Sequence, residues 1–160
     1  MAELNMSRHG TSMFLAIQLG DLRLLVPQED VSTVESATDI RIPTSKFGAF
    51  GSIRIGRERL PVYCLSESLG ELRADLGSRR ICPILAGRDG NYGVLCDEVE
   101  LIPADQLDGK ALPPAMRGES VAIGGLAIHE EHLVCVSSAD ALFNTIQRLI
   151  DERLADKAVA

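Results

Sequence analysis

Short apolar runs, each broken by glycine, proline or a polar cluster, occupy most of the chain. Phe14–Leu19 and Leu22–Val26 flank Gly20-Asp21, a two-residue spacing typical of a β-hairpin. Val31–Val34 is a further extended run, and the polar segment Ser36–Lys46 follows it. The pattern therefore predicts a hairpin, a third strand and a loop.

A second hairpin is predicted within Gly51–Leu65. Ser52–Ile55 and Arg59–Cys64 are β-prone runs, and the connection between them begins with Gly56, which can adopt positive φ. Beyond this hairpin, Leu65–Gly70 is predicted to form one helical turn closed by its glycine. The charged segment Glu71–Ser78 then separates the two halves of the chain.

The second half contains more runs of the same kind, at Arg80–Ala86, Tyr92–Cys96, Val99–Ile102, Val121–Ile128 and Leu133–Val136. Pro103–Leu107 is predicted as a short helix. Asp108–Glu119, which contains Pro113-Pro114, is predicted as a surface loop.

The hydrophobic period changes to that of a helix at Ala139, where Ser137 or Ser138 can cap the first turn. The apolar stripe consists of Leu142, Phe143, Ile146, Leu149, Ile150 and Leu154. The pattern predicts a helix over 139–155. Its first half should pack on the strands, and its second half, with Leu149, Ile150 and Leu154, should project for self-association or for docking a partner.

Some nine strands and one late helix predict an all-β barrel or sandwich, because a βαβ sheet would need helices between its strands. The break at Glu71–Ser78 indicates two small β units, each too small to bury enough apolar surface alone. We expect a single domain over 13–150 in which the two units share a hydrophobic core, preceded by a flexible N-terminus at 1–12.

Composition and charge argue against nucleic acid. The 160 residues carry a net charge of −7, and they include only four Phe, two Tyr and no Trp on which bases could stack. Met1–Ser12 lacks the apolar core of a signal peptide, and no later run approaches the length of a membrane span. These features predict a cytoplasmic protein that does not insert into a membrane.

Candidate catalytic and metal-binding residues do not form a recognisable pattern. Cys64, Cys82, Cys96 and Cys135 occur singly in apolar runs, which is typical of buried free thiols. His129 and His132 lie in a predicted turn, where two ligands are too few for a metal site. No catalytic residue, metal or cofactor is therefore predicted.

Three segments together resemble CheW, the adaptor that couples chemoreceptors to the histidine kinase CheA. Gly48–Leu65 is similar to the family's "GxxNxRGxxxPVxDL" hairpin, and Gly93–Val99 is similar to its "GxxVDxV" segment. Ile123–Phe143 is similar to the closing segment of the family. The resemblance implies two five-stranded, SH3-like barrels around a shared core.

The same resemblance implies a non-enzymatic scaffold whose partners are a methyl-accepting chemoreceptor tip and the regulatory domain of a CheA-type kinase. Carried over by motif, the receptor-facing residues are Val31, Val34, Gly56 and Arg57, with Arg57 as the main polar contact.

Several polar positions depart from the family pattern. The tip reads Gly56-Arg57 where the family has Arg-Gly, and Thr33, Arg54 and Cys64 replace the family's acid, asparagine and acid. The sequence is therefore as compatible with a non-flagellar pathway, such as type IV pilus control, as with chemotaxis. A cysteine-dependent enzyme or redox sensor using Cys64 is the alternative from another functional class.

Overall fold

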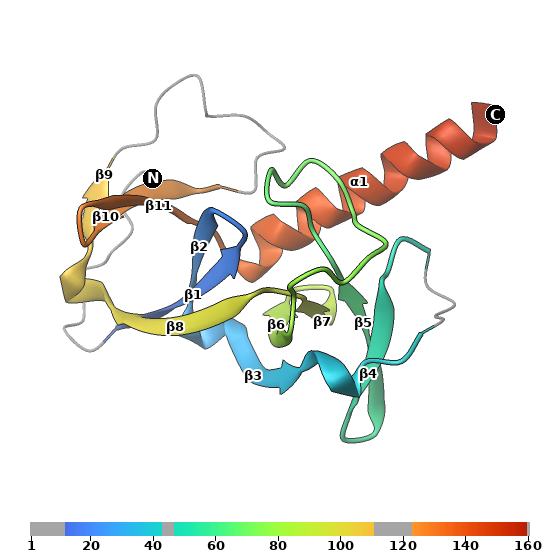
Figure 1. The fold of residues 1–160 in the computed structure, drawn as a ribbon, viewed down its shortest axis with the longest axis horizontal. Coiled ribbons are helices and arrows are strands. Elements are labelled where there is room, and N and C mark those ends of the chain that lie inside the picture. The colour runs from blue at the N-terminus through green and yellow to red at the C-terminus, as the bar shows by residue number, and fades with distance from the viewer. Residues whose placement is uncertain (1–11, 43–46, 111–122, 160) are drawn as a thin grey trace.

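A computed structural model of the chain describes residues 12–42, 47–110 and 123–159. Figure 1 shows two curved β units side by side, with one long helix that begins between them and runs toward the upper right, past the second unit. Within the described ranges, no helix is long and apolar enough to cross a membrane. The predicted flexible N-terminus and most of the predicted loop at 108–119 lie outside these ranges.

The first sheet has six strands in the order β8-β1-β2-β11-β10-β9. All neighbours are antiparallel except β11 and β2, which pair in parallel. Its strands therefore come from both ends of the described chain. Their bounds are β1 Met13–Leu19, β2 Leu22–Pro27, β8 Glu98–Pro103, β9 Asp108–Lys110, β10 Gly125–His129 and β11 His132–Val136.

The second sheet has five strands in the order β3-β6-β7-β5-β4. Its strands are β3 Val31–Ser36, β4 Gly51–Ile55, β5 Glu58–Tyr63, β6 Ile81–Gly87 and β7 Gly90–Val94. Short 3-10 helices lie at η1 Gln28–Asp30, η2 Ala37–Asp39 and η3 Ala104–Gln106. The predicted class, mainly β with a C-terminal helix, is confirmed.

Three apolar clusters form the core. One lies within the first sheet and includes Phe14 and Val134, and another lies within the second sheet and includes Ile53 and Leu95. The third and largest cluster, which we call the seam, combines residues of both sheets with residues of the helix. Because burial of apolar surface is the main favourable term in folding, the seam makes the two units one structure.

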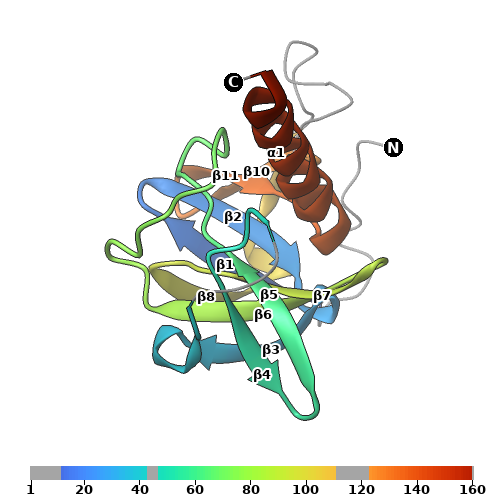
Figure 2. The same ribbon diagram turned by 90° about the vertical axis from the view of Figure 1, so that its right-hand side faces the viewer.

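The helix α1, Ala139–Val159, begins where its sequence signals predict. Ser138 accepts a hydrogen bond from the Ala141 N–H, and the Asp30 carboxylate accepts one from the Ala139 N–H at 3.0 Å. A side-chain acceptor at the first turn satisfies an N–H that has no partner within the helix. Figure 2 shows α1 at one side of the molecule, rising beyond the strands toward its C-terminal end.

The second half of the α1 stripe does not project as predicted. Leu149 and Ile150 are buried in the seam, and among the three predicted docking residues only Leu154 is exposed, at 46%. Further along the helix, Arg153 donates to the Leu72 carbonyl at 2.7 Å, and the Lys157 ammonium lies 5.1 Å from the Phe47 ring centre. The segments before β4 and after β5 thus contact the second half of the helix, which the sequence predicted to project.

Two local predictions were wrong. Leu65–Gly70 is not a helical turn, because Leu65 forms an isolated antiparallel bridge with Leu72. Asp108–Lys110 is not a loop but the edge strand β9, which pairs with β10 through its backbone. The resemblance implied five strands in each barrel, and β9 is one reason the first sheet has six.

Candidate partner-binding site

The β4–β5 hairpin projects from the second sheet in both ribbon views (Figures 1 and 2). Its two-residue turn is Gly56-Arg57, closed by the pairing of Ile55 with Glu58. Gly56 has φ +61°, as a glycine at the first turn position of a type II′ hairpin requires. The glycine-first order therefore suits this turn, and it presents Arg57 as an exposed side chain at the tip.

Val31 and Val34 share one face of β3 because the strand contains a β-bulge. The register shifts between Val31 and Thr33, so that Val31 pairs with Leu85 and Val34 with Pro83. Partners two residues apart on β6 face the same side, whereas residues three apart on a regular strand face opposite sides. Val31 packs against the seam, and Val34 is 43% exposed.

A groove adjoins Val34, with a volume of about 570 Å³. It lies between the segment from β3 to η2 and the approach to β6, and its lining combines apolar and charged side chains. The lining residues are Val34, Glu35, Ser36, Ala37, Thr38, Leu76, Arg79, Arg80 and Ile81.

The four predicted site residues do not form one cluster on adjacent strands. Val31 and Val34 lie on β3 and the Gly56-Arg57 turn follows β4, and these are the two edge strands of the second sheet. The bulge brings the two valines to one face, and the turn brings Gly56 and Arg57 to one tip. The structure thus presents a groove and a projecting tip as two separate surfaces of the same sheet.

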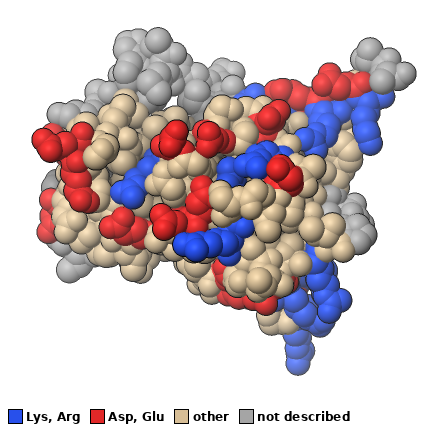
Figure 3. All heavy atoms as spheres, viewed as in Figure 1, with Lys and Arg blue, Asp and Glu red and all other residues tan. Residues whose placement is uncertain are grey.

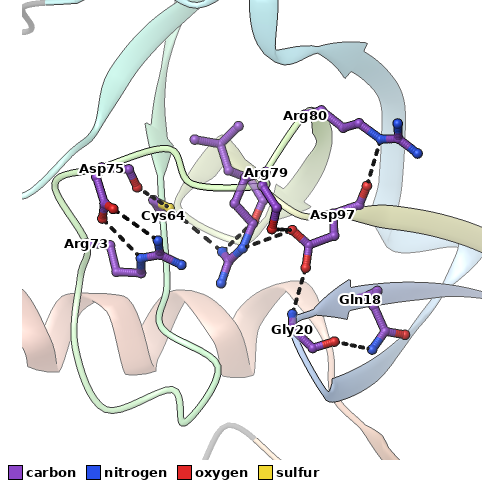
Figure 4. A network of polar contacts seen from close by, with 10 residues as sticks. Gln18, Gly20, Cys64, Arg73, Asp75, Arg79, Arg80 and Asp97 are labelled. Carbon is purple, nitrogen blue, oxygen red and sulfur yellow. Dashed lines mark hydrogen bonds and ion pairs between the residues drawn. The ribbon is translucent and has the colours of Figure 1, made fainter.

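Asp97 joins the first sheet to the second unit, as Figure 4 shows. One carboxylate oxygen accepts the Gly20 N–H at 2.7 Å, and the other accepts the Ser78 hydroxyl at 2.6 Å. The Asp97 N–H donates to the Gln18 carbonyl at 2.9 Å. Burial by itself would raise the pKa of Asp97, but the hydrogen bonds from Ser78 and Gly20 and the Arg79 charge outweigh it, and its pKa lies below the usual 3.8.

Arg79 is a buried cation in the same network, with a side chain only 1% exposed. Its Nε lies 3.6 Å from the Asp97 carboxylate, and its Nη1 donates to the Leu95 carbonyl at 3.2 Å. Nη1 also lies 3.7 Å from Cys64 Sγ. The cysteine that replaces the family's acid therefore faces a guanidinium whose counter-charge comes from Asp97.

All four cysteines are free thiols, but the prediction that all four are buried was wrong for Cys135. Cys64, Cys82 and Cys96 are buried, and Cys135 is partly exposed. Burial raises the pKa of Cys82 and of Cys96 to about 12. Burial also raises the pKa of Cys64, against a smaller opposing effect of Arg79, so Cys64 lacks the exposed, low-pKa thiol that an enzyme or redox sensor would need.

His129 and His132 pair with each other across the β10–β11 hairpin. His129 is buried and lies beside Glu130, whereas the exposed His132 contacts the Glu130 carbonyl at 2.9 Å. Among the described side chains, no three His, Cys, Asp or Glu residues gather in a way that could hold a metal ion.

The CheW-like domain family matches residues 13–147, and the chain belongs to this family. By this family membership it is a scaffold and not an enzyme. The fold is also similar to the crystal structure of the scaffolding protein TtCheW from Thermoanaerobacter tengcongensis. That match has a TM-score of 0.64 at 20% identity, and it covers 83% of this chain and 92% of the other. No curated protein sequence gives a significant match.

Sequence reasoning found the tip and the valines but missed the Asp97–Arg79 network. Asp97 was predicted only as part of the Gly93–Val99 segment, and Arg79 falls between the charged segment Glu71–Ser78 and the run Arg80–Ala86. The position of Asp97 in the family's "GxxVDxV" segment was the available signal. A charged residue at a recurring position among apolar neighbours is a candidate for a buried polar contact.

Proposed function

We propose that this chain is the adaptor of a bacterial chemosensory array, holding a chemoreceptor tip and the regulatory domain of a CheA-type kinase in fixed relation. Membership of the CheW-like family is the observation that carries the proposal. The proposal places the chain in the cytoplasm, a compartment in which its four free thiols stay reduced.

The receptor-facing region of the proposal consists of Val31, Val34, Gly56 and Arg57. Val34 offers an exposed apolar side chain beside the groove, and Arg57 offers a charge at the tip. Val31 supports the same face by packing against the seam, and Gly56 sets the turn that presents Arg57. Val34 and Arg57 would therefore contact the receptor, whereas Val31 and Gly56 would position them.

The output of the array is the finer part of the proposal. The polar recognition positions depart from the family pattern while the apolar framework remains, which supports a dedicated receptor and kinase pair. We propose a non-flagellar output such as type IV pilus control. Deleting the gene and measuring twitching and swimming separately would test this, since a loss confined to swimming would contradict the assignment.

A reconstitution experiment tests the coupling itself. The full chain would be mixed with the purified kinase and with a receptor signalling fragment from the same organism, and the ternary complex would be measured by analytical ultracentrifugation. We expect the kinase to sediment with the receptor only when the chain is present. Wild-type protein that binds neither partner at micromolar concentration would overturn the proposal.

Val34→Glu tests the contribution of the groove to that complex. A carboxylate at the groove border would lose its hydration against an apolar partner. We therefore expect this substitution to weaken binding by about 1–2 kcal/mol. Leu133→Glu is the matched control, because Leu133 is an exposed apolar residue on β11, in the first sheet. Equal weakening by both variants would show that the groove has no specific role.

A further inference from the structure

The outer face of the β4–β5 hairpin carries a pair of arginines. Arg54 on β4 and Arg59 on β5 are directly opposed in the register, and both are exposed. Residues directly opposed in an antiparallel pair point to the same face. Arg57 in the turn adds a third guanidinium just beyond them. We call these three residues the arginine tip.

Like charges opposed across two strands destabilise a hairpin. Among the residues that the structure describes, no carboxylate forms an ion pair with any arginine of the tip. Within the part of the chain that the structure describes, Arg54 donates to the Gly56 carbonyl at 3.4 Å, and Arg59 donates to the Ser52 hydroxyl at 3.2 Å. Glu58 is the acidic residue of this hairpin, and its side chain points to the opposite face from Arg59, the next residue along β5. Within the described residues, the three positive charges of the tip are therefore not held in ion pairs.

The rest of the molecule has the opposite charge. The chain carries 16 Lys and Arg against 23 Asp and Glu, and Figure 3 shows basic side chains at the lower end, where the hairpin projects in Figure 1. An extended polyanion, such as DNA or an acidic membrane, would meet the net negative field of the whole protein. A small acidic surface that touches only the projecting tip would avoid that repulsion.

The geometry points to an acidic helix as the partner of the arginine tip, bound through carboxylates spaced four residues apart. Opposed strand residues lie about 5 Å apart, and side chains at i and i+4 of a helix lie about 5–6 Å apart. Guanidinium groups bind carboxylates through two parallel hydrogen bonds. This inference rests on the proposed function, in which the same hairpin faces the receptor, and it assigns Arg54 and Arg59 to that contact.

A defined peptide tests the chemistry without the receptor. The probe is a 15-residue alanine-based helical peptide with three Glu placed four residues apart, and its matched control has Gln at those positions. The Nε–H signals of the full-length chain would be followed by NMR. We expect the Glu peptide to shift the signals of Arg54, Arg57 and Arg59, and salt to weaken this binding.

Arg88 is the internal control, because it lies in the β6–β7 turn of the same sheet and pairs with Asp140 at 3.7 Å. Its signal should not move. An equal shift of Arg88, an equal response to the Gln peptide, or tighter binding of phosphatidylglycerol vesicles at matched charge concentration would each overturn the inference.

A double variant connects the tip to the proposed function. Arg54→Gln with Arg59→Gln should weaken binding of the Glu peptide and of the receptor fragment by about 5- to 30-fold. Arg88→Gln should change neither. If wild type binds the receptor and the double variant binds it equally well with the same salt dependence, the inference fails while the proposed function stands. If wild type does not bind the receptor, the proposed function fails, and the peptide titration alone decides the inference.

Discussion

The carboxylate of Asp97 accepts the backbone N–H of Gly20 at 2.7 Å, across 77 residues of sequence. Gly20 is in the turn between β1 and β2, and Asp97 directly precedes β8, so the contact fixes that turn against the segment that leads from the second sheet to the first. Ser78 and Arg79 contact the same carboxylate from the approach to β6. One side chain therefore links the β1–β2 turn to the approach to β6, in addition to the apolar contacts of the seam.

Asp97→Asn should destabilise the fold by about 2–3 kcal/mol, because it leaves the buried Arg79 charge without a counter-charge. The new amide can still accept one hydrogen bond, which limits the loss. Urea denaturation would measure the effect. Asp75→Asn is the matched control, since Asp75 pairs with Arg73 on the surface, and it should leave the urea midpoint nearly unchanged. An Asp97→Asn protein as stable as wild type would contradict the role of the network.

The contribution of Asp97 to stability should be lost in acid. The pKa of Asp97 lies below its usual 3.8 in the folded state, so the carboxylate stabilises the fold above that pH and loses its contribution as pH falls through the folded pKa. Wild type should therefore lose stability below about pH 4 more steeply than Asp97→Asn. Urea midpoints at pH 7 and at several values below pH 4 would check this. A constant difference between the two proteins would contradict it.

The thiols should react in the order of their burial. At pH 8 and without denaturant, a thiol reagent should modify Cys135 first, because the other three cysteines are buried. Cys64, Cys82 and Cys96 should react only on unfolding. Mass spectrometry of partly labelled protein would identify the modified cysteines. Rapid labelling of Cys64 in the folded protein would contradict this order and favour the cysteine-dependent enzyme or redox sensor.

Substitutions in the β10–β11 turn should stabilise the fold. Glu130 and Glu131 have φ +50° and +68°, a left-handed conformation that costs a residue with a side chain about 1 kcal/mol or more. Glu130→Asn with Glu131→Gly should therefore raise the free energy of unfolding by about 1–2 kcal/mol. Glu131→Ala is the control, because it removes the charge and keeps the strain. An equal gain in the control would attribute the effect to charge.

The effect of alanine substitutions in the apolar stripe of α1 should depend on the burial of each side chain and not on its position along the helix. Ile150→Ala should cost about 2–4 kcal/mol, because Ile150 is buried in the seam. Leu154→Ala should change stability by no more than about 0.5 kcal/mol. Thermal melts of both variants would decide. If Leu154 mediates self-association, its variant would alter the sedimentation of the chain without altering its melt.

Local pattern predicted the elements well, and it failed where a long-range contact decides the structure. The alternation around Gly20 and Gly56 predicted both hairpins to within about a residue, because turn residues and period act locally. The polar Asp108–Lys110 gave no strand signal, since an edge strand can pair through its backbone alone.

The same limit applies to the candidate site. The bulge in β3 leaves no mark in the order Val31, Ser32, Thr33, Val34, yet it decides that both valines face one side. The burial of Arg79 depends on the Leu95 carbonyl and the Asp97 carboxylate, which only the folded chain brings to it. Arg57 could be assigned to the tip because its turn is local.

Arg57→Glu tests the central claim most directly. The side chain is exposed at the hairpin tip, so the variant should melt as wild type does, while charge reversal should weaken receptor binding by at least about tenfold, or about 1.4 kcal/mol. Isothermal titration of the full chain with the receptor fragment would measure this, with Arg88→Glu as the control for charge reversal elsewhere on the sheet. We expect weaker receptor binding and unchanged kinase binding for Arg57→Glu alone. Full receptor affinity in a normally folded Arg57→Glu protein would contradict the account.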